Sequence, residues 1–342
     1  MTARRSIVLV GLLLALATGC THDGAGAEPV GTGVIGEATP TTTPMVGAKD
    51  STSGPLAGPP DRIQGGGVLI YASEAPGAQA SLTAWRPTGT VEALSLAVDD
   101  PLGSARISPN GKRIAWLAVD QRGGGTLLVA NLDGSGRTEL GRAMDAFCVE
   151  PVWSGDGAKV LTRGVDGHVG TVDTGTGAVT PLTSDVDGCH LMWSADGRAI
   201  AYSNGAGQVY VAQGDGSNAR RVPRLGQDGG PARRRSFDLM SLSADGRYLA
   251  LGVHTGDRPD GDVVRSFTAN EIVDTTTGET RDLSVSGEIT QAFFGPAGLV
   301  VRTRSAAANQ VYLLDPNLGM IANVVEPAVL KNLILIGYGG TG

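Results

Sequence analysis

Two cysteines lie at similar distances from two tryptophans, and the chemistry they suggest is a covalent cross-link. Cys148 precedes Trp153 by five residues, and Cys189 precedes Trp193 by four. In an exported protein, which meets oxidising conditions, this pair predicts a disulfide. A metal site built from Cys148, Cys189 and the adjacent His190 is an alternative, but it lacks a clear fourth ligand and any Cys-x-x-Cys spacing. Two buried free thiols are the third interpretation.

Carboxylates form the second group of candidate site residues. They precede a series of apolar segments, and five such groups around one opening would make a negative funnel for a divalent cation or a basic peptide. The alternative is that these are ordinary polar loops, in a chain whose formal net charge is −7. The predicted acidic rim consists of Asp100, Asp145, Asp187, Asp238 and Glu288.

Three further aspartates, Asp156, Asp196 and Asp245, each stand directly before a glycine in the pattern Ser-x-Asp-Gly. An aspartate in such a turn accepts hydrogen bonds from nearby backbone N–H groups, so we predict a structural role. The pattern differs from the sialidase Asp-box, in which another residue stands between Asp and Gly. The sequence has no nucleophile elbow, zincin helix or phosphate loop, and its negative charge disfavours nucleic-acid binding.

The N-terminus has the pattern of an export signal. Arg4 and Arg5 precede an apolar run over residues 7–18. This run is too short to span a membrane, which takes about 20 residues. The run leads into Leu-Ala-Thr-Gly-Cys, which resembles the lipobox of bacterial lipoproteins, with Ala17 where leucine is commoner. The resemblance implies a lipoprotein signal peptide over residues 1–19 and a lipid, such as palmitate, on Cys20. An ordinary secretory signal with an incidental cysteine, or a short uncleaved anchor, is the alternative.

A segment of unusual composition follows. Residues 20–65 are rich in Gly, Pro and Thr and contain no aromatic residue. Because such a segment has no apolar period, it cannot bury enough surface to offset the entropy of ordering, so we predict a flexible tether. The folded domain is then expected in residues 66–342.

An internal repeat organises this domain. Five segments, each made of an apolar strand, a short turn and a second apolar strand, recur with 46, 40, 49 and 52 residues between their turn glycines. An Asn-Gly or Asp-Gly pair between two such strands is a strong hairpin signal, because glycine tolerates positive φ. A second strand–turn–strand unit follows each copy, which gives four short strands per repeat, the size of a propeller blade. The turn glycines are Gly111, Gly157, Gly197, Gly246 and Gly298.

Two terminal fragments complete the count of blades. Residues 67–95 offer three strands without a first, and residues 327–339 offer one apolar strand without partners. Together they predict a sixth blade, closed by the C-terminal strand, which removes the two open edges of the ring. The predicted fold class is therefore an all-β, six-bladed β-propeller. In such a ring Cys148 and Cys189 would lie near the starts of the innermost strands of neighbouring blades, and the acidic rim would surround one mouth of the central channel.

Four copies of the turn carry a family resemblance. They read Ser-Pro-Asn-Gly, Ser-Gly-Asp-Gly and twice Ser-Ala-Asp-Gly, and they end at Gly111, Gly157, Gly197 and Gly246. This turn after an apolar strand resembles the TolB-type, WD-like repeat of six-bladed propellers, and the resemblance covers nearly all of residues 67–342. Nothing in the chain resembles the N-terminal domain of TolB proteins, so the resemblance implies the fold and no role in a Tol system.

These patterns predict an extracytoplasmic lipoprotein that is held on the cell membrane by the lipid on Cys20, or that lies in the periplasm. We expect a binding or scaffold function, in which a propeller face recognises an envelope protein or a small ligand, with no nucleic acid and no required cofactor. One alternative is a propeller hydrolase or lactonase that uses a divalent cation in the channel. Another is an accessory or sensor subunit of an envelope complex. An enzyme is the less favoured interpretation, since a fold alone does not imply a function.

Overall fold

The computed structural model describes residues 67–73, 81–87, 89, 91–94, 105–119, 124–145, 150–183, 186–204, 206–226, 234–255, 268–295 and 298–340. The predicted signal peptide and tether lie outside this set, so both stay predictions. Within the set, no helix is long and apolar enough to cross a membrane.

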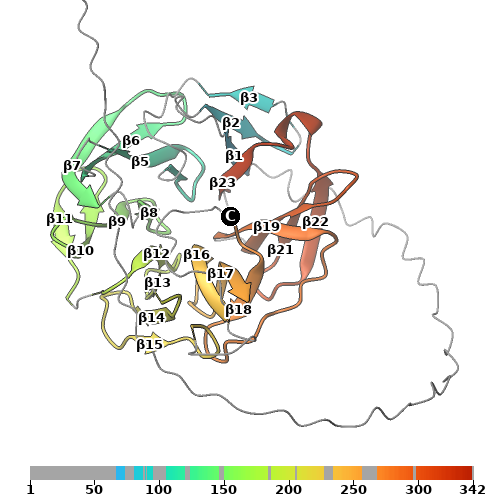
Figure 1. Cartoon of the computed structure of the whole chain (residues 1–342). Helices are drawn as coiled ribbons and strands as arrows, with labels where there is room; N and C mark the ends of the chain where they lie inside the picture. The colour runs from blue at the N-terminus through green and yellow to red at the C-terminus, as the bar shows by residue number, and fades with distance from the viewer. Residues whose placement is uncertain are drawn as a thin grey trace, which may run out of the picture. The chain divides into compact units, whose positions relative to one another are not determined.

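Six antiparallel sheets account for the strands of the described residues, and they are arranged around a centre as the blades of a propeller (Figure 1). Five of the six blades have four strands each, and the remaining one, the fifth in chain order, has three. The first blade contains β1 (Val68–Ala72), β2 (Leu82–Trp85), β3 (Val91–Ala93) and β23 (Ile334–Gly339). The second contains β4 (Arg106–Ile107), β5 (Arg113–Val119), β6 (Gly124–Asn131) and β7 (Thr138–Asp145). The third contains β8 (Val152–Trp153), β9 (Lys159–Arg163), β10 (Val169–Asp173) and β11 (Val179–Pro181).

The remaining three blades follow in chain order. The fourth contains β12 (Cys189–Trp193), β13 (Ala199–Ser203), β14 (Val209–Gln213) and β15 (Arg220–Arg221). The fifth contains β16 (Arg234–Leu242), β17 (Tyr248–Thr255) and β18 (Glu271–Asp274). The sixth contains β19 (Glu288–Gly295), β20 (Gly298–Arg304), β21 (Gln310–Leu314) and β22 (Met320–Val325), and a short 3₁₀ helix, η1 (Ala328–Leu330), leads from it to β23.

The ring is closed by a strand from the far end of the chain. β23 pairs antiparallel with β1, and the register places Gly339 opposite Val68 and Leu335 opposite Tyr71. The sheet order β23-β1-β2-β3 makes the C-terminal strand the innermost one of the first blade. The blade predicted from residues 67–95 and 327–339, which is the first blade in the order used here, is therefore confirmed.

The Ser-x-Asp-Gly turns have the structural role that the sequence predicts. In the third blade, Asp156 Oδ1 accepts hydrogen bonds from Ser154 Oγ at 2.6 Å and from the Ala158 amide at 2.9 Å. Ser154 Oγ in turn accepts a bond from the Lys159 amide at 2.9 Å, and Gly157 follows at a φ of 70°. The hydrogen bond from Ser154 and the one from the Ala158 amide lower the pKa of Asp156, which keeps the turn carboxylate ionised. The same arrangement recurs at Asn110, Asp196 and Asp245.

Apolar side chains fill the spaces between neighbouring blades. One cluster joins the first two blades and contains Ile70 and Ile336 from one and Ile114 and Trp116 from the other, all of them fully buried. Each sheet thus buries both faces, which explains why its inner strands are apolar at successive positions. The packing fixes the innermost strands around one centre, and the candidate site is built at their ends.

Candidate binding site

The innermost strands of the six blades, which are β23, β4, β8, β12, β16 and β19, end around a common cavity. The cavity has a volume of about 110 Å³ and opens to solvent. We call it the mouth pocket. Each innermost strand contributes a large side chain from its last two positions: Ile107, Trp153, Trp193, Leu242, Phe294 and Tyr338.

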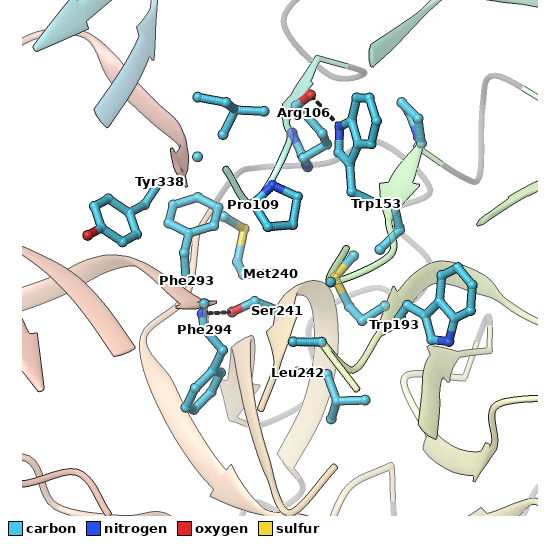
Figure 2. A pocket seen from close by; sticks show the side chains of 18 of the residues that line it. Arg106, Pro109, Trp153, Trp193, Met240, Ser241, Leu242, Phe293, Phe294 and Tyr338 are labelled. Atoms are coloured by element: carbon cyan, nitrogen blue, oxygen red, sulfur yellow. Dashed lines mark hydrogen bonds between the residues drawn. The ribbon is translucent and has the colours of Figure 1, made fainter. Parts of the chain in front are cut away.

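The lining of the mouth pocket is rich in aromatic side chains and methionines (Figure 2). Aromatic residues make up only 4% of the chain, yet the pocket takes two of its four tryptophans together with Phe293, Phe294 and Tyr338. Met192 and Met240 also line it. Methionine adapts its shape to what it contacts, and aromatic rings bury a large area with little loss of entropy. Such a lining suits the binding of an apolar group.

The two indole N–H groups of the pocket are bonded within the protein. Trp153 Nε1 donates to the carbonyl of Arg106 at 2.9 Å, across the boundary between the third and second blades. Trp193 Nε1 donates to the carbonyl of Gly197 at 3.2 Å, within its own hairpin. Since these donors are engaged, neither indole presents a free N–H group to an incoming ligand.

A serine hydroxyl in the pocket is engaged in the same way. Ser241 Oγ donates to the carbonyl of Ala292 at 3.0 Å. It accepts from the amide of Phe294 at 2.9 Å, as Figure 2 shows. These bonds link the innermost strands of the fifth and sixth blades. They also direct the hydroxyl proton to a backbone carbonyl, so that the serine does not stand as an activated nucleophile. Burial raises the pKa of the Tyr338 phenol, which is therefore uncharged at neutral pH.

Arg106 is the charged side chain among the described residues that line the pocket. Its guanidinium forms a buried ion pair with Glu150 and donates to the carbonyl of Ala105 at 2.8 Å. Burial lowers the pKa of Arg106 to about 10, against the opposite effect of the Asp238 carboxylate. The guanidinium is thus charged at neutral pH and balanced by the carboxylates of Glu150 and Asp238.

A second buried pair lies between the innermost strands of the fourth and fifth blades, β12 and β16. His190 Nδ1 lies 3.8 Å from Asp238 Oδ1, and both side chains are almost completely removed from solvent. His190 has a φ of 52°, and the pairing of β12 with β13 shifts register between Cys189 and Met192. On β12, His190 stands two residues before Met192 of the mouth pocket, and on β16, Asp238 stands two residues before Met240.

The structure describes four of the five residues of the predicted acidic rim. Asp238 lies within β16 with an exposed fraction of 0%, because that strand begins four residues earlier than the aspartate. Glu288 is exposed and pairs with Arg304 at 3.0 Å, at the opposite end of β19 from Phe294. Asp187 is exposed before β12, and Asp145 ends β7, the outermost strand of the second blade. Asp100 lies outside the described residues, so a joint action of all five stays a prediction. Among the described residues, no three His, Cys, Asp or Glu side chains form a group that could hold a metal ion.

Cys189 begins β12. Its predicted partner, Cys148, lies outside the described residues, as does Cys20, so the Cys148–Cys189 pairing and the lipid on Cys20 both stay predictions.

The mouth pocket was not predicted from the sequence. The rim residues were sought before these strands, whereas the pocket lies where the strands end. A signal was present, since Trp153 and Trp193 each stand directly before the serine of a Ser-x-Asp-Gly turn in a chain with few aromatic residues.

No protein family and no curated protein matches this sequence. Solved structures share its fold. TolB from Acinetobacter baumannii superposes with a TM-score of 0.53 at 19% identity, over 81% of this chain and 67% of that one. A chain of a nidogen/laminin complex superposes with a TM-score of 0.50 at 10% identity, over 80% of this chain and 97% of that one. At these identities the likeness concerns the fold alone, and it identifies a TolB-like six-bladed β-propeller.

Proposed function

We propose that this chain is a binding protein of the cell envelope whose mouth pocket receives an apolar group of an envelope protein or a small ligand. The observation that carries the proposal is the convergence of aromatic and methionine side chains from five of the six blades on one open cavity. A site at the centre of a rigid ring is held by every blade, so its shape is set before the partner arrives, and this lowers the entropic cost of binding.

The internal bonding of the polar groups favours binding over catalysis. Hydrolysis would require a nucleophile next to a base, or a metal-bound water. In the pocket, Ser241 is bonded to backbone groups on both sides, and Arg106 is paired with Glu150. The arrangement supports apolar contact and offers no activated group.

The cellular place is the second part of the proposal. The lipobox-like ending at Cys20 supports an anchor in the membrane, and the Gly-, Pro- and Thr-rich residues 20–65 support a spacer between the lipid and the propeller. The partner would then be met on the extracytoplasmic side of the membrane or in the periplasm. A role as an accessory subunit of an envelope complex fits the same geometry.

A neutral, apolar fluorescent probe tests the site. The full chain is titrated with N-phenyl-1-naphthylamine, whose emission rises when it leaves water. We expect saturable binding of one probe per chain, with an affinity about tenfold lower in Trp193→Ala, a loss of about 1.4 kcal/mol. Val165→Ala is the control, because Val165 is 60% exposed in the turn between β9 and β10. Equal affinity in wild type and Trp193→Ala would place the binding elsewhere and overturn the proposal.

A further inference from the structure

The outer edge of the sixth blade differs from the other blade edges. β22 is the last strand of its sheet in the described part of the chain, and it reads Met-Ile-Ala-Asn-Val-Val (Figure 1). It has six residues, no charge and no proline. A strand at the edge of a sheet presents a row of backbone N–H and C=O groups that another strand can pair with.

The outermost strands of four other blades carry features that discourage such pairing. β3 contains Glu92 and has three residues, and β11 ends at Pro181. β15 consists of two arginines. β7 is long but carries Glu139 and Arg142. In contrast, β22 has neither a charge nor a proline to protect its edge.

Exposed apolar side chains gather at the same edge. Six large hydrophobic side chains are exposed in the described residues, and three of them lie within residues 320–329. Met320 is 37% exposed, Val325 is 60% exposed and Val329, in the η1 helix that follows, is 69% exposed. Apolar surface that is concentrated in this way marks an interaction site more often than scattered residues do.

We propose that this edge pairs with the same edge of a second copy of the chain, so that two propellers share one continuous sheet. The strand is complementary to itself when a two-fold axis, perpendicular to the sheet, passes between two copies of Asn323. Asn323 then faces Asn323, Ile321 faces Val325, and Ala322 faces Val324 on the other side of the sheet. These three opposing pairs join similar groups, amide to amide and apolar to apolar, and such cross-strand pairs stabilise antiparallel sheets.

Self-pairing also explains why the edge needs no charged residue. A two-fold interface is formed by the same patch on both subunits, and it closes after two copies, so it does not propagate into a fibre. The backbone groups of β22 gain partners, and Val325 is covered by Ile321 of the second copy. The mouth pocket lies at the centre of the ring and stays open in this dimer.

Disulfide trapping in the membrane tests the pairing directly. Directly opposed residues of antiparallel strands have Cα atoms about 4.5–5.5 Å apart, within the range of about 4.4–6.8 Å that a disulfide spans. Full-length Asn323→Cys is therefore expected to form a covalent dimer on mild oxidation, seen as a band of twice the mass on a non-reducing gel. Val179→Cys is the matched control, because Val179 is 59% exposed on β11, the outermost strand of the third blade.

A second substitution distinguishes strand pairing from cross-links that form when two chains meet at random. Adding Val325→Lys to Asn323→Cys places a charge at the paired edge and is expected to reduce the dimer band at least tenfold, while probe binding at the mouth pocket is unchanged. Three results would overturn the proposal: no dimer with Asn323→Cys, an equal dimer with Val179→Cys, or a cross-linked band whose mass corresponds to a different protein. Probe binding reports on the mouth pocket alone, so it separates failure of the dimer from failure of the proposed function.

Discussion

The guanidinium of Arg302 forms a bidentate ion pair with the carboxylate of Glu326, in which Nε donates at 2.9 Å and Nη2 donates at 2.7 Å. Both side chains are buried, with exposed fractions of 6% and 1%. Arg302 also donates to the carbonyls of Leu330 and Leu333, at 3.1 Å and 2.8 Å. A side chain of β20 thus holds the segment that leads from the sixth blade to the closing strand β23.

This buried pair should matter for the stability of the closed ring. Arg302→Ala leaves the carboxylate of Glu326 buried without its cation, so we expect the free energy of unfolding to fall by about 3–5 kcal/mol. Arg304→Ala is the control on the same strand, because its pair with Glu288 is exposed and should contribute less than about 1 kcal/mol. Urea denaturation measures both values. Similar losses of unfolding free energy in the two variants would show that the Arg302–Glu326 pair has no special part in closing the ring.

The two pocket tryptophans should have separable roles. Trp153 is 6% exposed and its ring is covered by the guanidinium of Arg113, 5.4 Å from the ring centroid, so Trp153→Ala is expected to lower stability by about 3–5 kcal/mol. Trp193 is only half-buried, so Trp193→Ala should weaken probe binding with a smaller loss of stability. Thermal unfolding and probe titration of each variant check this. A larger loss of stability in Trp193→Ala than in Trp153→Ala would be inconsistent with the assigned roles.

The turn aspartates predict a pH dependence of stability. The hydrogen bond from Ser154 holds the pKa of Asp156 below its ordinary value of 3.8. The stabilisation by this carboxylate is therefore complete above pH 3.8, and it is lost as the pH falls through the lower pKa of the folded state. Asp156→Asn should lack this dependence, because Asn110 forms the equivalent turn with an amide.

Melting temperatures between pH 5 and pH 2 test the sign of this effect. The advantage of wild type over Asp156→Asn should shrink as the pH falls, and the converse variant Asn110→Asp should gain a dependence of the same sign. An advantage that grows in acid would contradict the turn assignment.

The predicted Cys148–Cys189 disulfide should stabilise the fold by joining neighbouring blades. On the chain-entropy model a cross-link that closes a loop of about 41 residues contributes about 4 kcal/mol. Cys148→Ser, Cys189→Ser and the double variant should therefore lose the same amount, because each removes the same bond. Mass spectrometry of a non-reduced digest should find the two peptides linked. Two free thiols in the denatured wild-type chain, or a bound metal ion lost together with the cysteines, would contradict the disulfide.

The sequence was informative about the fold because each repeat carries a local signal. A Ser-x-Asp-Gly turn needs only its own hydrogen bonds to form, so the hairpins could be located from short patterns. The closing strand could also be inferred, since an apolar strand without partners at residues 327–339 matched three strands without a first at residues 67–95. These are arguments about strands and turns, which sequence patterns express directly.

The mouth pocket could not be inferred in the same way. It is made of single side chains from six strands that are distant in sequence, and each of them has the character of an ordinary core residue. The position of Asp238 was also unpredictable, because β16 pairs with β17 through register shifts between Ser236 and Asp238 and between Leu239 and Ser241. Each shift changes which side of the strand a residue faces, so the place of the carboxylate depends on irregularities that the repeat pattern does not encode.

Site-specific photo-cross-linking in intact cells tests most directly whether the mouth pocket is the binding site. A photoreactive phenylalanine analogue is placed at Phe294, in the mouth pocket, and in a second strain at Val165, on a turn outside it. If the mouth pocket is the binding site, illumination should link one defined envelope component to the chain from position 294, and Trp193→Ala should reduce this product. An equal product from position 165, or a product at 294 that persists unchanged in Trp193→Ala, would contradict the claim that the mouth pocket is the binding site.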